Sequence, residues 1–107
     1  MLRLESPLQI GNRRTTQETE LGGQRISAGT FLHLIIASAN RDEDVFDHAD
    51  DFIVDRNPNQ HLAFSHGIHT CAGNSVARIE ASIAFGRLLE RFPDFTRASE
   101  TIRPHRS

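Results

Sequence analysis

The stretch AFSHGIHTCAGNSVARIE, residues 63–80, contains the single cysteine of the chain, Cys71. Glycines stand four residues before it and two after it, at Gly67 and Gly73. Glycine suits a backbone that must bend tightly or let a large flat group approach closely. The sequence therefore predicts a tight loop that presents one thiol just ahead of a helix. Residues 61–71 are called the cysteine loop below.

The helix that follows the cysteine loop is predicted to cover residues 74–92. Asn74 or Ser75 is expected to cap its N-terminus, and Pro93 ends the pattern. Apolar residues follow two faces at helical spacing: Val76, Ile79 and Ile83 on one, and Ala77, Ala81, Ala84 and Leu88 on the other. A helix with two apolar faces needs a partner on each. We therefore expect the second face to be exposed and to drive formation of a homodimer or larger oligomer.

Upstream of the cysteine loop the sequence predicts short strands and an irregular segment. Threonines and glycine turns over residues 8–29 indicate short strands. Residues 30–37 are an apolar run whose start favours a strand passing into one helical turn. The acidic residues 40–60 are expected to form a meander anchored by Phe46 and Phe52. The predicted fold class is α+β, with small antiparallel strands and a meander, then the cysteine loop and one long helix.

Composition narrows the classes of partner. The chain has 107 residues, 37% of them apolar and 24% charged, with a net charge of −2, which suits a globular protein of at most one domain. Its arginines are scattered, so neither nucleic acid nor membrane is expected as a partner. The longest apolar run, residues 32–39, is far shorter than the roughly 20 residues of a membrane span. No secretory signal is visible and one cysteine forms no internal disulfide, so we expect a cytoplasmic protein.

The residues allow three interpretations of Cys71. It can be a small buried apolar side chain, a nucleophile activated by the following helix N-terminus, or a thiolate ligand to a metal. The flanking glycines favour a site that a large flat group approaches. His69 could hold an anionic group beside such a site, and Phe64 could shield it from water.

The segment FSHGIHTCAG, residues 64–73, resembles the haem-binding signature of the cytochromes P-450, F-x-x-G-x-[HR]-x-C-x-G, at every fixed position. The likeness extends over nearly the whole chain. Residues 40–46, NRDEDVF, look like the family's Asn-Arg-Asp-Pro-x-x-Phe segment, with Glu43 in place of proline. Residues 21–30 look like its small-sheet strands, and residues 77–80 resemble the start of its long proximal helix.

The resemblance implies a haem b site with Cys71 as the axial thiolate and metal ligand. His69 and Arg13 would hold the haem propionates, with Arg14 in that role if the register shifts by one. Phe64 would pack beside the sulfur. The full implied haem-binding set is Arg13, Phe64, Ser65, His69, Cys71, Ala72, Gly73 and Ala77. The sequence departs from the commoner family residues at three positions: Ser65 for glycine, Thr70 for phenylalanine and Ala72 for leucine.

The resemblance also implies that residues 1–107 are a single partial domain, the C-terminal haem-binding portion of a haem-thiolate monooxygenase. Such enzymes insert one oxygen atom of O₂ into an organic substrate with electrons from a redox partner. The distal half and the substrate pocket lie upstream of the matched region. Arg3 and Arg56 match two arginines of the family's ion-pair cluster, whose glutamate would fall one position before Met1. We therefore expect no turnover from this chain alone, and a redox partner only for the full enzyme.

Two alternatives remain at this point. The chain can be a non-catalytic remnant that binds haem weakly or only self-associates. Alternatively, three histidines and Cys71 form an H-x4-H-x2-H-x-C pattern that a zinc ion could use, with the candidate ligands His61, His66, His69 and Cys71.

Overall fold

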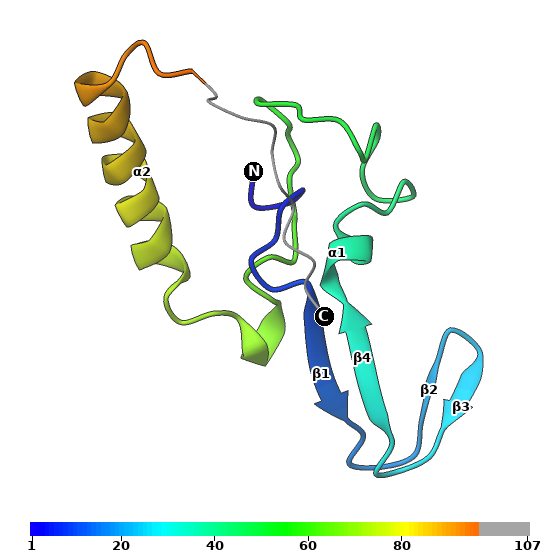
Figure 1. Ribbon diagram of the computed structural model, residues 1–107. Coiled ribbons are helices and arrows are strands. Elements are labelled where there is room, and N and C mark those ends of the chain that lie inside the picture. Colours follow the sequence, from blue (N-terminus) through cyan, green and yellow to red (C-terminus); the bar gives the residue numbers. More distant parts are fainter. Residues whose placement is uncertain (97–107) are drawn as a thin grey trace. The chain divides into compact units, whose positions relative to one another are not determined.

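The computed structural model describes residues 1–96 and divides the chain into two compact units, Met1–Cys71 and Ala72–Ser107. The first unit contains β1 (Ile10–Arg14), β2 (Thr19–Leu21), β3 (Gln24–Ile26), β4 (Phe31–Ile35), α1 (Ile36–Ala39) and the 3₁₀ turn η1 (Gly67–His69). The described part of the second unit contains one helix, α2 (Asn74–Arg91) (Figure 1). The predicted α+β class, with antiparallel strands first and one long helix last, is confirmed.

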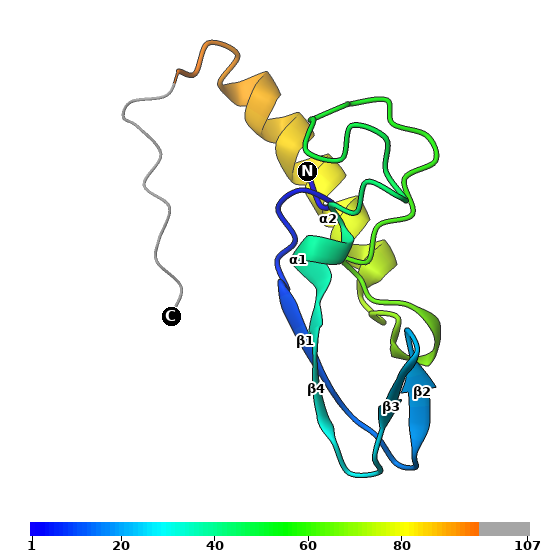
Figure 2. The same cartoon turned by 90° about the vertical axis from the view of Figure 1, so that its right-hand side faces the viewer.

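The strands of the first unit form two separate two-stranded antiparallel sheets. β1 pairs with β4 in a register from Ile10 opposite Ile35 to Arg14 opposite Phe31, and the two strands run side by side in both views (Figures 1 and 2). The hairpin β2–β3 lies between them in sequence. Its turn residues Gly22 and Gly23 have φ values of 56° and 76°, the left-handed pair that a tight two-residue hairpin requires. The expected glycine turn is confirmed.

The apolar run after residue 30 changes from strand to helix as predicted. β4 ends at Ile35 and α1 begins at Ile36, whose side chain is buried. Asn40 ends α1 by donating its backbone N–H to Ile36 O over 2.9 Å. The N-terminal residues form a single turn in which Glu5 N donates to Met1 O, and Arg3 within this turn bonds to carbonyl oxygens of the meander, those of Ala49 and Asp51.

The core of the first unit is small and partly polar. Its buried apolar side chains are Ile36, Phe46 and Ala49, and its buried polar ones are Arg3, Ser6 and Asn40. The expectation that Phe46 anchors the meander is confirmed. The same expectation for Phe52 is wrong, because 60% of that residue is exposed at the rim of a small cavity.

Helix α2 covers the predicted residues to within one position at its C-terminus. Its N-cap is Gly73, which makes no side-chain capping bond, so the expectation of a cap from Asn74 or Ser75 is wrong. The helix ends before Pro93, and none of its residues is buried. Among the described helices, none has the length and apolar character needed to cross a lipid bilayer.

Candidate functional site

The cysteine loop is closed by short hydrogen bonds between its own backbone groups. Cys71 N donates to Phe64 O over 2.8 Å, and Ser65 N donates to Leu62 O over 2.8 Å. Inside this closure, Thr70 donates to Gly67 O through both its N–H, at 3.0 Å, and its hydroxyl, at 2.8 Å. The bonds set Cys71 at the end of a compact loop whose shape depends on near neighbours in sequence.

Two residues of this loop take the left-handed backbone conformation. Ser65 and Gly67 both have a φ of 62°. A β-carbon added to Gly67 would meet nothing within 4 Å, so the backbone there borders open space. The predicted tight bend is confirmed at Gly67, whereas Gly73 has a φ of −83°, which any residue adopts.

The thiol of Cys71 is free and exposed, so the interpretation as a small buried apolar residue is wrong. Its donor chemistry fits haem iron, because a thiolate is a soft ligand that binds iron in the axial position. The open space beside Gly67 fits the approach of a large flat group. The free thiol and the open space beside Gly67 are compatible with a haem ligand at this loop.

Four of the predicted site residues lie together in the cysteine loop. They are Phe64 and Ser65, which are half-buried, and His69 and Cys71, which are exposed. The Phe64 ring lies 6.2 Å from the His61 ring, centroid to centroid. Ala72, Gly73 and Ala77 belong to the second unit, which begins at the residue after Cys71.

Arg13 and Arg14, the two candidates for a propionate contact, lie on opposite faces of β1. Successive strand residues point to opposite sides, and here Arg13 is half-buried while Arg14 is exposed. Arg14 Nε donates to Gly29 O over 3.0 Å, across the sheet edge. Arg13 Nη1 donates to Asn12 O over 2.7 Å, within its own strand. The two side chains therefore leave β1 on opposite sides of the strand.

The alternative zinc site is wrong. Within residues 1–96, no group of three histidine, cysteine, aspartate or glutamate side chains is arranged so that it could hold a metal ion. His61 instead accepts a hydrogen bond from Ala63 N at its Nδ1 over 3.3 Å.

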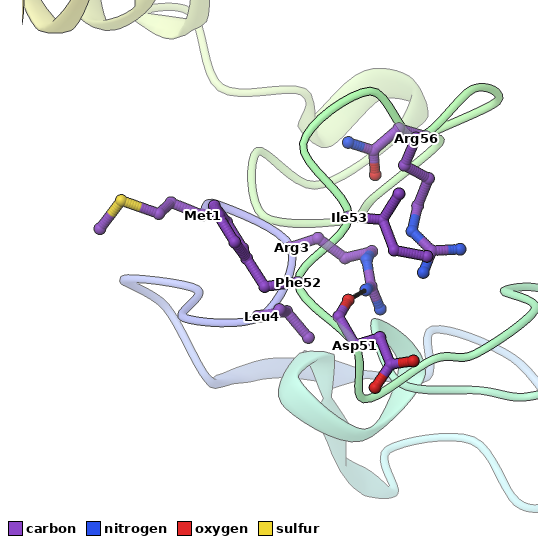
Figure 3. Close-up of a pocket in the computed structure, with 8 residues that line it drawn as sticks. Met1, Arg3, Leu4, Asp51, Phe52, Ile53 and Arg56 are labelled. Carbon is purple, nitrogen blue, oxygen red and sulfur yellow. Dashed lines mark hydrogen bonds between the residues drawn. The ribbon is translucent and has the colours of Figure 1, made fainter.

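A second polar site surrounds Arg3, which is only 5% exposed. Its guanidinium donates to three carbonyl oxygens, those of Asn40 at 2.8 Å, Ala49 at 2.5 Å and Asp51 at 3.1 Å. It also lies over the Phe46 ring, 4.9 Å from the centroid. A small cavity of ≈ 20 Å³ adjoins it (Figure 3), lined by Met1, Arg3, Leu4, Asp51, Phe52, Ile53, Arg56 and Asn59.

Arg56 places a second cation at this cavity. Its Nη1 donates to Asp47 O over 2.6 Å and its Nη2 to His48 O over 2.9 Å, while its buried Nε has no hydrogen-bond partner among residues 1–96. Burial lowers the pKa of Arg3, and the positive charges of Arg56 and Arg41 lower it further. Main-chain carbonyls thus hold both Arg3 and Arg56, and the Nε–H of Arg56 is the group left without a partner within residues 1–96.

Sequence reasoning missed Asn40 as an individual residue, although it begins the segment NRDEDVF. Asn40 has no exposed surface at all and bonds to segments on both sides of it in the chain. An asparagine at the end of an apolar run is common at helix C-termini, so residue type alone carries no sign of this role.

A family model described as cytochrome P450 matches residues 1–104 of the chain. The biotin biosynthesis cytochrome P450 of Bacillus subtilis is 42% identical over 97 residues, which are 91% of this chain and 25% of that protein. The steroid C26-monooxygenase of Mycolicibacterium smegmatis is 42% identical over 106 residues, covering 99% of this chain and 26% of that protein. The chain thus spans about a quarter of the length of these curated relatives.

Solved structures of cytochromes P450 are also similar to this chain. P450BioI, crystallised with an acyl carrier protein ligated to hexadec-9Z-enoic acid, matches with a TM-score of 0.90 and 42% identity, over 96% of this chain and 27% of that one. CYP109E1 from Bacillus megaterium in complex with testosterone matches with a TM-score of 0.89 and 36% identity, over 99% of this chain and 30% of that one.

Proposed function

Because the chain belongs to the cytochrome P450 family, we propose that its cysteine loop binds haem with Cys71 as the axial thiolate. The family is haem-dependent. The observation that carries the proposal is the free, exposed thiol at the end of a loop closed by the bond from Cys71 N to Phe64 O. We place the haem-binding signature at residues 64–73, and take residues 1–107 as part of a single domain.

The surrounding residues would hold the haem in distinct ways. The exposed His69 would donate to one propionate, and Arg13 on β1 would hold the other through a charge-assisted hydrogen bond. Phe64, half-buried in the loop, would pack beside the sulfur, and Ser65, the next residue, would contact the haem. Ala72, Gly73 and Ala77 have small side chains or none, which would allow close contact with the proximal face. When bound, haem supplies the oxygen chemistry of the family.

In the full-length enzyme this chemistry would be monooxygenation of an organic substrate with O₂ and electrons from a redox partner. The chain covers 25–26% of the two curated relatives described above, so we propose that it shows no turnover alone. We further propose a cytoplasmic location, with neither nucleic acid nor membrane as a partner.

Haem titration of the purified chain tests the proposal. We expect the ferrous–carbonyl difference spectrum to show the red-shifted band typical of thiolate ligation. Cys71→Ala should lose this band, and His69→Ala should keep it with weaker haem binding. Spectra of the parent and Cys71→Ala that cannot be told apart would reject Cys71 as the ligand.

A second candidate function, self-association, is favoured by α2. Val76, Ile79 and Ile83 are 57%, 60% and 61% exposed, and the face with Ala77, Ala81, Ala84 and Leu88 is unburied as well. We propose that a second copy of the chain covers the alanine face. Sedimentation should show a dimer or larger species, and the double change Ala81→Glu and Ala84→Glu should shift it to monomer. A parent chain that stays monomeric at high concentration would contradict this.

A further inference from the structure

Asn40 is the most completely buried polar residue of the first unit, with 0% of its surface exposed. Its side chain spans two segments far apart in sequence. Nδ2 donates to Ser6 Oγ over 2.7 Å, and Oδ1 accepts from Leu62 N over 2.7 Å. Its main chain adds two bonds, from N to Ile36 O at 2.9 Å and from Arg3 Nη1 to O at 2.8 Å. The nitrogen and the oxygen of its side-chain amide therefore each have a hydrogen-bond partner, and so do its backbone N–H and its backbone carbonyl.

The orientation of the Asn40 amide follows from its partners. A backbone N–H can only donate, so the atom that faces Leu62 N must be the carbonyl oxygen. The amide nitrogen then faces Ser6, whose hydroxyl accepts from it and donates to Leu2 O over 3.1 Å. The hydrogen bond from Leu62 N thus needs an acceptor atom in the side chain at position 40. The Ser6 hydroxyl, in contrast, can bond either to a donor or to an acceptor there.

The bond to Leu62 fixes the base of the cysteine loop. Leu62 O accepts from Ser65 N at 2.8 Å, and two residues after Leu62, Phe64 O accepts from Cys71 N at 2.8 Å. Leu62 is itself held across 22 residues by Asn40 Oδ1. The side chain of a buried core residue, Asn40, therefore holds the backbone two residues before the carbonyl that receives the Cys71 amide.

We propose that Asn40 is a positioning residue for Cys71. Its amide oxygen fixes residues 62–64, and these fix the cysteine backbone through the bond to Phe64 O. The importance of this position for ligation rests on the proposed function, in which Cys71 binds haem iron. Asn40 also orders the cysteine loop in the haem-free chain, because the hydrogen bonds that hold the loop do not involve haem.

Amide hydrogen exchange of the haem-free chain, followed by NMR, tests this claim. The measured quantity is the exchange rate of the Ser65 and Cys71 amides divided by that of amides in the β1–β4 pair. Global loss of stability raises both rates together, whereas loss of loop positioning raises this ratio. Asn40→Leu keeps the size of the side chain and removes the acceptor, so we expect the ratio to rise about tenfold.

Two variants serve as matched comparisons. Ser6→Ala deletes the other side-chain bond of Asn40 and keeps the acceptor for Leu62, so its ratio should match that of the parent. Asn40→Asp also keeps an acceptor, and its ratio should stay within about threefold of the parent. If Asn40→Leu does not fold, these two variants decide. A tenfold higher ratio in Asn40→Asp than in Ser6→Ala, or an unchanged ratio in Asn40→Leu, overturns the proposal.

Haem loading separates this inference from the proposed function. In the ferrous–carbonyl spectrum, we expect the thiolate-type band to be a smaller fraction of the bound haem in Asn40→Leu than in the parent. In Ser6→Ala this fraction should equal that of the parent. If no variant binds haem while the exchange ratios behave as expected, the proposed function fails and the positioning role stands. If haem binds normally and the ratio in Asn40→Leu is unchanged, only the positioning role fails.

Discussion

Ser65 and Gly67 provide a matched test of how the cysteine loop is held, because both have a φ of 62°. A residue with a β-carbon loses roughly 1–2 kcal/mol in this conformation. Replacing Ser65 by glycine removes that strain, but glycine adds freedom to the unfolded chain worth about 0.5–1 kcal/mol. We therefore expect Ser65→Gly to stabilise the first unit by about 0.5–1 kcal/mol. Gly67→Ala should destabilise it by a similar net amount: its β-carbon would meet nothing within 4 Å, so the backbone strain is offset only by the reduced freedom of the unfolded chain.

The assay must follow the loop itself, because the chain has no tryptophan or tyrosine for fluorescence. Urea titration followed by the NMR signals of the Cys71 and β4 amides reports on the first unit. With a slope of about 2 kcal/mol/M, the expected change shifts the midpoint by about 0.25–0.5 M, upward for Ser65→Gly and downward for Gly67→Ala.

Ser65→Ala is the control, because it keeps the β-carbon and removes only the hydroxyl. Its midpoint should stay close to that of the parent. If Ser65→Ala and Ser65→Gly raise the midpoint equally, the hydroxyl and not the backbone is responsible. An unchanged midpoint in Gly67→Ala would show that the left-handed conformation carries no cost here, and the reasoning would fail.

Two further predictions concern arginines. Arg3→Met leaves three carbonyls without their donor but relieves the repulsion from Arg56, so we expect a loss of about 1–3 kcal/mol in urea unfolding. The matched change Arg25→Met removes a side chain that is 79% exposed and should cost less than about 0.5 kcal/mol; equal losses would contradict the buried role of Arg3. Arg13→Leu should weaken haem binding about tenfold in a titration, whereas Arg14→Leu, on the opposite strand face, should leave it unchanged. The reverse order would assign the propionate contact to Arg14.

The elements that local sequence determines were predictable. The change from strand to helix after residue 35 and the extent of α2 follow from apolar periodicity, which depends on neighbours within a few residues. The glycine turn at Gly22 and Gly23 follows from the backbone conformation that the hairpin needs. The N-cap of α2 was not predictable, because the chain enters that helix through Gly73 without a side-chain cap although two good capping residues follow it.

Features that depend on distant partners were outside the reach of the sequence. Asn40 is bonded to residues 34 positions before it and 22 positions after it, and a polar residue type gives no sign of complete burial. Phe52 is 60% exposed because it lies at the rim of the small cavity next to Arg3, a place that depends on residues distant in sequence. The left-handed conformation of Ser65 is not indicated by serine itself, which normally avoids it; the only sign in the sequence is that the family has glycine at this position.

The two polar sites of the first unit differ in how far apart in sequence their bonded residues lie. The closure of the cysteine loop joins residues seven or fewer positions apart, so the geometry around Cys71 can form within a chain that spans about a quarter of its relatives. At the second site, Arg3 and Arg56 bind carbonyls, and the buried Nε of Arg56 has no partner in residues 1–96. The site at Cys71 meets the core through Asn40, and Arg3 bonds to the carbonyl of that same residue. Asn40 therefore links the arginine cavity to the cysteine loop, and because energetic coupling is reciprocal, we expect changes at either one to affect the other through this residue.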